Sequence, residues 1–487
     1  MSACNAQASH IVDSRFFSGS YATEEARRIF CDLRRMQRWL DVEVALAGSQ
    51  AELGIIPAAA AAALAETGRL ERLAIDAIHA DIVRTCHSLL PLLDAWQKTC
   101  TVEAGRFIHF GATTQDIQDT AQILEIKDVL ALINRDLHSI ANELVQLTDT
   151  YRDQVMIGRT HGQQALPTVF GLKTATWLDE LLRNMQRLDE CSGRTMVSQL
   201  FGGVGTMAAF GSNGIELLRL FSKKLGLADP LVAWHSTRDR TAELLSTMAI
   251  LAGGLARIAN EIYQLARDEI CELEEPFYMG KVGSSTMPHK RNPELCEQVV
   301  VLARLIKANA MLGLDSLINE HERDYRAVRL EWVTITDSSL FLCAITGIMK
   351  NILGNLVVHG NTMLDNVEKS ATLISTEALM FFIGDKIGKQ KAHQLLYEVS
   401  MQAHDTNCSL LDLLLADKRI RAHFSAAQLK KAVEPAGHVG LAGELIDRVL
   451  AAGRKRLKTR TRKTDTASLC PLAGKDGTCI FHNRKGK

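Results

Sequence analysis

The stretch ELLSTMAILAGGL, residues 243–255, decides the class of fold. Among its apolar side chains, Leu244, Met248, Leu251 and Leu255 recur at intervals of four, three and four residues. That spacing places them on one face of an α-helix, whereas a half-buried strand would alternate apolar and polar residues. The stretch therefore predicts a long helix with one buried face.

The same periodicity returns in other segments that lack proline. Leu178, Leu181, Leu182 and Met185 share one helical face. Proline breaks helix interiors, and the chain has only nine prolines, with none within residues 294–434. Alternating runs of β-branched residues are almost absent. We predict an all-α fold in which the longest helices form a central bundle.

Changes in helix length and composition suggest where the domains begin and end. Residues 1–111 are expected to form an N-terminal domain of shorter helices, and residues 112–368 the bundle of long helices. Residues 369–453 are expected to form a smaller helical cap. Residues 454–487 carry eleven lysines or arginines against two aspartates, so we expect a basic, disordered tail there.

The overall composition excludes several classes of protein. Lysine plus arginine equals aspartate plus glutamate, at 56 each, so no net charge indicates nucleic acid or an acidic membrane as partner. No apolar run reaches the roughly 18 residues that span a bilayer, and no secretory signal opens the chain. The eleven cysteines are scattered singly, as is typical of reduced thiols in a cytoplasmic protein. We expect neither a metal nor an organic cofactor.

One loop between long helices is rich in reactive groups. Residues 280–293, GKVGSSTMPHKRNP, contain glycines, serines and prolines that interrupt the helical pattern. Ser284 and Ser285 offer hydroxyls, and Lys290 and Asn292 offer a cation and an amide two residues apart. In an extended chain these last two side chains point the same way, which suits one carboxylate. We therefore predict a functional loop.

This loop carries a family resemblance. GSSTMPHKRNP, residues 283–293, is similar to the signature of the fumarase/aspartase superfamily, and its HKR version resembles the branch of adenylosuccinate lyase and 3-carboxy-cis,cis-muconate cycloisomerase. HFGATTQD at residues 109–116 and GRTHGQQ at residues 158–164 resemble the first and second family loops. The likeness extends over roughly residues 12–452. It implies a homotetramer with a multi-helix core, in which each active site takes the three loops from three subunits.

The resemblance also implies catalytic roles. The family reaction removes a proton from the carbon next to a carboxylate and then expels a group from the neighbouring carbon. By its place in the motif Ser284 is expected to be the base, although the sequence alone does not separate it from Ser285. His161 is expected to be the general acid, because imidazole titrates near neutrality. Glu297 matches a family glutamate that pairs with this histidine.

Other residues are expected to bind a small dicarboxylate-type substrate. A dianionic transition state needs fixed cations and hydrogen-bond donors. Lys290 and Asn292 would hold one carboxylate. The hydroxyls of Thr113, Thr114 and Thr160 would hold the other, although threonines at such positions also serve as helix caps.

Two further histidines match residues that line the family's substrate pocket. His109 matches one of them within its loop, and His87 in TCHS, residues 85–88, matches another on a shorter motif that also fits a buried structural role. His87 and His161 both resemble residues of adenylosuccinate lyases. At the position of His161, cycloisomerases tend to carry tryptophan. Both histidines therefore favour a lyase.

Two segments favour the cycloisomerase side. WHSTRDR, residues 234–240, resembles the cycloisomerase segment, and Arg238 and Arg240, in the part common to both enzymes, are expected to contact substrate. VRLEW, residues 328–332, stands where adenylosuccinate lyases have Ser-Ser-Val-Glu-Arg to hold the nucleotide. The hydroxyls and the arginine are missing. Arg326 and Arg329 are candidates to bind a different anion, and a role in coating the helix surface is the alternative for both.

We therefore predict a fumarate-releasing carbon–nitrogen lyase that acts on an N-substituted aspartate or related succinate by anti β-elimination. The alternative enzyme is a muconate-type cycloisomerase. A structural protein without activity, as in the lens crystallins, and a nucleic-acid binder acting through the basic tail are the alternatives from other classes.

Overall fold

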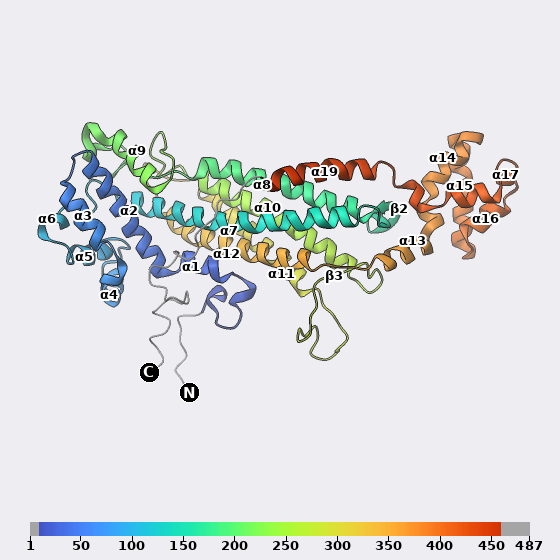
Figure 1. Cartoon of the computed structure of the whole chain (residues 1–487), viewed down its shortest axis with the longest axis horizontal. Coiled ribbons are helices and arrows are strands. Elements are labelled where there is room, and N and C mark those ends of the chain that lie inside the picture. The colour runs from blue at the N-terminus through green and yellow to red at the C-terminus, as the bar shows by residue number, and fades with distance from the viewer. Residues whose placement is uncertain (1–8, 459–487) are drawn as a thin grey trace.

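The longest helices lie side by side along the molecule and confirm the all-α prediction (Figure 1). The computed structural model describes residues 9–458. The long helices are α7 (Thr114–Thr150), α8 (Phe170–Thr195), α10 (Asp239–Leu265), α11 (Glu294–Asp315) and α12 (Tyr325–Gly354). The predicted face of α10, Leu244 to Leu255, is buried in the core of this bundle.

Shorter helices cover the end of the bundle where α7 begins (Figure 1). Their buried apolar side chains are continuous with the core of the long helices, so no separate core divides the two regions. They are α1 (Glu24–Phe30), α2 (Asp32–Glu52), α3 (Ala58–Thr67), α4 (Ile75–Thr85), α5 (Leu90–Gln97), α6 (Val102–Gly105) and α9 (Gly214–Leu225).

A second, smaller core lies at the opposite end of the molecule (Figure 1) and unites side chains from Leu379 to Val433. The helices beyond α12 are α13 (Gly360–Ile374), α14 (Thr376–Ile387), α15 (Lys389–Thr406), α16 (Leu410–Ala416), α17 (Lys418–Arg421), α18 (Ala426–Ala432) and α19 (Ala442–Leu457).

Helix α19 differs from the prediction in two ways. Its residues Ala442, Ile446 and Leu450 belong to the core of the long bundle, whereas we had assigned them to the C-terminal cap. It also continues to Leu457, past the predicted start of the disordered tail at residue 454. Arg454 and Arg456 explain the difference, because they form ion pairs with carboxylates of α7 and α8. Residues 459–487 of the predicted tail lie outside the described residues.

The chain also forms two small antiparallel sheets that we did not predict. β1 (Val155–Thr160) pairs with β2 (Gln163–Val169), and β3 (Leu273–Glu274) pairs with β4 (Val357–Val358). The first sheet is a hairpin that joins α7 to α8. It carries the segment that resembles the second family loop.

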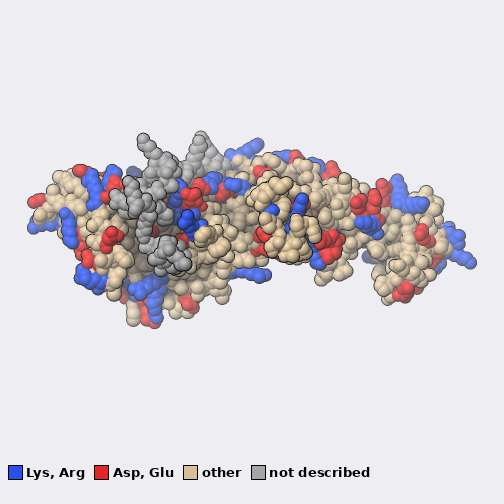
Figure 2. All heavy atoms as spheres, turned by 90° about the horizontal axis from the view of Figure 1, so that it is seen from below, with Lys and Arg blue, Asp and Glu red and all other residues tan. Residues whose placement is uncertain are grey.

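Helices α10 and α12 are long and apolar enough to cross a membrane by length and composition alone. Within their most apolar windows, 61% of α10 and 67% of α12 is buried inside the molecule. Their apolar residues are therefore used as core of the bundle. On the face seen in Figure 2, positive and negative side chains are interspersed over the described part of the chain.

Candidate active site

The three loops that resemble the family loops lie far apart in one chain. Thr113 stands at the start of α7, and the hairpin β1–β2 follows the far end of that helix (Figure 1). Helix α7 has 37 residues, so it separates these two loops by about 55 Å at 1.5 Å per residue. The loop before α11 projects from the side of the bundle (Figure 1). A single chain therefore does not bring the three loops together.

Ser284 sits in a local turn that supplies hydrogen-bond donors to its oxygen. Its Oγ accepts the backbone N–H of Met287 at 3.0 Å and that of Thr286 at 3.3 Å. Two amide donors stabilise negative charge on this oxygen, as they would in an alkoxide. Ser285 is exposed. The local geometry therefore favours Ser284 as the group that accepts a proton.

Contacts within the loop and at its base fix its shape. Asn292 Nδ2 donates to the carbonyl oxygen of Gly283 at 2.6 Å, which closes the loop. A Cβ at Gly283 would lie 2.2 Å from the carbonyl oxygen of Lys290, so only glycine allows this approach. Lys281 forms an ion pair with Glu275 at 2.7 Å. The loop thus holds Ser284 on a closed frame and leaves the Lys290 side chain exposed.

His161 occupies the tip of the hairpin between β1 and β2. Thr160 pairs with Gln163, so His161 and Gly162 form a two-residue turn. Their φ angles are 52° and 76°, and positive φ at both positions defines the type I′ turn that hairpins favour. Both residues are exposed, as is Thr160. The hairpin therefore presents the imidazole outward.

Glu297 does not meet His161 in this chain. It is an exposed residue in the first turn of α11, whereas His161 is at the hairpin. Arg159, two residues before His161, instead binds Glu272 beside β3 with two hydrogen bonds of 2.8 and 2.9 Å. That ion pair anchors the hairpin close to its turn. The predicted pairing of Glu297 with His161 stays a prediction for contacts between subunits.

A cavity of about 340 Å³ gathers another group of predicted residues. His87 and Thr114 line it with Arg329, so the α4–α5 connection, α7 and α12 all contribute. Arg323, which we did not predict, also lines the cavity and donates to Thr113 Oγ1 at 2.8 Å. The sequence offers one indication that Arg323 belongs to the site, which is its position just before α12.

The hydrogen bonds of His87 define its tautomer. Its Nδ1 lies 3.1 Å from the backbone N–H of Leu90 and 3.3 Å from that of Leu89. Because both groups are donors, Nδ1 must be the acceptor, and the ring proton of the neutral imidazole is then on Nε2. His87 therefore caps the start of α5 and keeps one N–H for hydrogen bonding elsewhere.

His109 is paired with a buried carboxylate. Its Nδ1 lies 2.6 Å from Glu43 Oε1, and the Glu43 side chain is almost fully buried. Burial alone would lower the pKa of His109, but the hydrogen bond and the charge of Glu43 outweigh it and raise the pKa above its ordinary value. The protonated imidazole is therefore favoured in the folded protein.

We expect Glu43→Gln to lower the pKa of His109, because burial then opposes the charged imidazole while only the charge of Asp116 still favours it. The change is measured by NMR titration of the imidazole. Because the folded-state pKa is raised, the ion pair stabilises the wild type fully below the unfolded pKa, and this contribution disappears as pH rises through the folded pKa. An unchanged pKa in the variant would contradict the assigned cause.

Arg238 is placed differently from our expectation. Its side chain is fully buried and forms ion pairs with Asp119 of α7 and Glu331 of α12, the first at 2.9 Å. Both edges of the guanidinium are occupied by carboxylates, so it does not face a substrate in this structure. Arg240 is half-buried and donates to the Arg194 carbonyl oxygen at 3.2 Å. We therefore assign Arg238 to the bundle frame rather than to the binding set.

Replacing Arg238 with methionine should destabilise the protein by about 3–5 kcal/mol, because Asp119 and Glu331 would remain buried without a cation. The measurement is the midpoint of urea unfolding. Arg257→Met is a matched control in α10, since Arg257 pairs with Glu180 on the surface and such pairs contribute about 0–1 kcal/mol. Equal losses in the two variants would contradict the structural role of Arg238.

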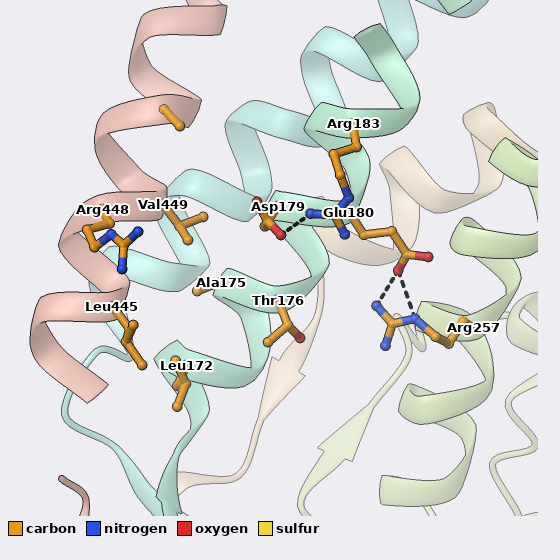
Figure 3. A pocket seen from close by; sticks show the side chains of 11 residues that line it. Leu172, Ala175, Thr176, Asp179, Glu180, Arg183, Arg257, Leu445, Arg448 and Val449 are labelled. Atoms are coloured by element: carbon orange, nitrogen blue, oxygen red, sulfur yellow. Dashed lines mark hydrogen bonds and ion pairs between the residues drawn. The ribbon is translucent and has the colours of Figure 1, made fainter. Parts of the chain in front are cut away.

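A second cavity lies elsewhere, and none of the predicted site residues lines it. It has a volume of about 590 Å³ between α8, α10 and α19. Figure 3 shows two ion pairs on its wall, Asp179 with Arg183 and Glu180 with Arg257. We therefore place the candidate site at the loops and at the smaller cavity.

Comparison with known proteins identifies the class. Residues 19–307 match the family described as Lyase, and residues 372–449 match the one described as Adenylosuccinate lyase C-terminus. The chain is 40% identical over 443 residues to the N-acetyl-S-(2-succino)cysteine lyase of Dickeya dadantii, covering 91% of this chain and 97% of that one. It is 36% identical over 440 residues to the adenylosuccinate lyase of Methanothermobacter thermautotrophicus, covering 90% and 98%.

A solved structure agrees with these relatives. The crystal structure of 3-carboxy-cis,cis-muconate lactonizing enzyme from Pseudomonas putida superimposes with a TM-score of 0.86 at 31% identity, covering 91% of this chain and 99% of that one. The chain belongs to the fumarase/aspartase superfamily and is a lyase. Its relatives include both enzymes of the branch that the loop motifs resembled.

Proposed function

We propose that this lyase releases fumarate from a succinylated thiol, with N-acetyl-S-(2-succino)cysteine as the first candidate substrate. The observation that carries the proposal is the 40% identity, along nearly the whole chain, to a relative named for that reaction. The sequence had favoured a carbon–nitrogen bond. The succinyl half is common to both substrate classes, and only the leaving group differs.

The reaction is an elimination across two neighbouring carbons of the succinyl group. Ser284 removes a proton from the carbon next to one carboxylate, and the electron pair passes through an aci-carboxylate into the new C=C bond. The C–S bond then breaks, and the thiol leaves with its electron pair. His161 supplies a proton to the sulfur. The amide donors at Ser284 Oγ support this role, because they stabilise its deprotonated form.

The remaining predicted residues would bind the two succinyl carboxylates. Lys290 is exposed at the serine loop and supplies a cation. Asn292 lies beside it: one hydrogen of its amide nitrogen bonds the Gly283 carbonyl oxygen and fixes the loop, and the other remains to donate to the carboxylate. Thr113 and Thr114, at the start of α7, would meet the other carboxylate together with the Nε2–H of His87.

The proposed site needs more than one chain. Helix α7 holds the Thr113 loop and the His161 hairpin about 55 Å apart, which no small substrate spans. Exposed apolar side chains on the long helices are consistent with subunit contacts. They are Ile250, Val301, Leu305, Met311, Leu312, Leu314 and Val333. We propose a homotetramer, and light scattering should give about four times the 53.7 kDa chain mass; a monomer would contradict this assembly.

The proposed chemistry requires only acid, base and charge from the protein. Within residues 9–458, no three His, Cys, Asp or Glu side chains are grouped to hold a metal ion. No disulfide joins the eight cysteines of that range, which suits our proposal of a cytoplasmic location. We propose no nucleic-acid or membrane partner.

Adenylosuccinate is the second candidate, favoured by the match of residues 372–449 to the adenylosuccinate lyase C-terminus. A substrate panel separates the candidates: N-acetyl-S-(2-succino)cysteine, adenylosuccinate and 3-carboxymuconate, with fumarate followed by absorbance and lactone by chromatography. We expect the highest kcat/KM on the thioether. A higher value on adenylosuccinate would transfer the proposal to the carbon–nitrogen bond, and lactone without fumarate would overturn both.

A further inference from the structure

The cavity between the α4–α5 connection, α7 and α12 contains uncompensated positive charge. Arg323 and Arg329 both line it, and none of its described lining residues is an aspartate or glutamate. Arg323 precedes α12, and Arg326 and Arg329 lie in its first turns. The partners of these three arginines decide which one is available to a ligand.

The three arginines have different partners. Arg326 is neutralised by Asp324, with Nε at 2.9 Å from Oδ1, and points its charge away from the cavity lining. Arg323 donates to the Thr113 hydroxyl at 2.8 Å and to backbone carbonyls, which holds its guanidinium in place. Arg329 lies over the Tyr325 ring at 5.5 Å, and no carboxylate of the described residues pairs with it. Arg329 is therefore the cation available to an anionic ligand.

The orientation of α12 is fixed by the buried ion pairs. Glu331 accepts from Arg238 Nε at 2.8 Å and from Thr241 Oγ1 at 2.7 Å, which ties α12 to α10. Arg329 and Trp332 are three residues apart and therefore share a helical face, which lines the cavity. The guanidinium is thus presented by a rigid helix beside an aromatic wall.

One helix end adds to the positive potential of this cavity. Thr114, the first residue of α7, lines it, and helix N-termini carry partial positive charge and favour anions. The start of α5 and that of α12 already have acceptors, His87 and the Asp324 carboxylate. Together with Arg329, the start of α7 makes the cavity suited to a carboxylate.

We propose that Arg329 binds the carboxylate of the leaving half of the substrate and thereby selects succinylated thiols whose leaving group is an anion. This inference rests on the proposed function. N-acetyl-S-(2-succino)cysteine has three carboxylates, and the predicted groups at Lys290 and at Thr113 and Thr114 account for the two on the succinyl half. The third, on the cysteine half, needs a separate cation.

The size of the cavity supports a small leaving group. Its volume of about 340 Å³ is near the lower end of the roughly 300–1,000 Å³ typical of ligand pockets. Trp332 packs against Trp39, with ring centroids 6.4 Å apart, and against Tyr325 at 6.3 Å. The bulky indole forms one wall of the cavity, so an acylated amino acid fits the remaining volume better than a nucleotide.

The test compares two substrates and two variants. The substrates are N-acetyl-S-(2-succino)cysteine and N-acetyl-S-(2-succino)cysteamine, which lacks only the third carboxylate. Arg329→Gln should lower kcat/KM for the first by about 10- to 100-fold, the loss expected for one charge-assisted hydrogen bond, mainly through KM. It should leave the second unchanged. Arg326→Gln, the matched control on the same helix, should keep the wild-type preference for the carboxylated substrate.

Each outcome supports or overturns the inference. Equal use of both substrates by the wild type would overturn it while the proposed function stands. An equal loss on both substrates in Arg329→Gln would also overturn it, since a general defect is not carboxylate recognition. If the wild type prefers adenylosuccinate and Arg329→Gln is impaired on that substrate, the inference is overturned, because Arg329 would then bind a phosphate. No fumarate from either thioether would remove the proposed function and this inference together.

Discussion

Replacing Ser284 with alanine should lower kcat for fumarate release by about 10³- to 10⁴-fold, the upper range for loss of a positioned general base. KM should change little, because the succinyl carboxylates are assigned to other groups. The physical reason is local: Ser284 Oγ receives two backbone N–H groups, at 3.0 and 3.3 Å, that favour its deprotonated form. The measurement is a steady-state rate of fumarate formation.

Ser285→Ala is the comparison that separates the adjacent hydroxyls. Ser285 is exposed, so its removal should leave kcat within about tenfold of wild type if it is not the base. Unchanged melting temperatures in both variants would show that the loop frame is intact. Full activity in Ser284→Ala together with a large loss in Ser285→Ala would show that Ser285 is the base.

Replacing His161 with asparagine should lower kcat by about 10²-fold on a succinylated thiol, the lower range for loss of a general acid. The loss is smaller than for an amine substrate, because a thiol with a pKa of about 8.5 leaves readily as a thiolate near neutrality. Asparagine is the appropriate replacement, because it tolerates the positive φ of this turn.

The control for His161→Asn is to compare its loss of kcat on different substrates. If the variant also acts on an amine-releasing substrate, its loss there should exceed its loss on the thioether. A hairpin disturbed by the mutation would instead reduce both rates equally and lower the melting temperature. An undiminished rate on every substrate would show that another group, such as His87, supplies the proton.

The long helices were predictable because their stability depends on a local pattern. Apolar residues at spacings of three and four, as at Leu244 to Leu255, define a buried face within a single segment. The hairpin was missed because its two strands show no regular apolar–polar alternation and Pro167 stands within the second. Its signal is a single turn, His161–Gly162, whose first residue is not the usual asparagine or aspartate. The last turn of α19 was missed because its arginines pair with carboxylates remote in sequence.

The candidate site was predictable where it lies in continuous motifs and not where it depends on tertiary pairing. Ser284, Lys290 and Asn292 occupy one loop, as the sequence indicated. The burial of Arg238 depends on Asp119 and Glu331, which are 119 and 93 positions away. The contact of Arg323 with Thr113 spans 210 positions. No local pattern encodes such pairs, so an arginine expected at the substrate proved to join three helices.

The most direct test concerns our central claim, that one active site takes its loops from different chains of an oligomer, since α7 holds the Thr113 loop and the His161 hairpin about 55 Å apart in one chain. Ser284→Ala and His161→Asn, each inactive or nearly so, are coexpressed with different tags, and mixed oligomers are purified by both tags. We predict that fumarate release returns to about one quarter of the wild-type rate, because random assembly gives about one site in four both intact groups. A mixed oligomer no faster than the average of its two parents would contradict the claim.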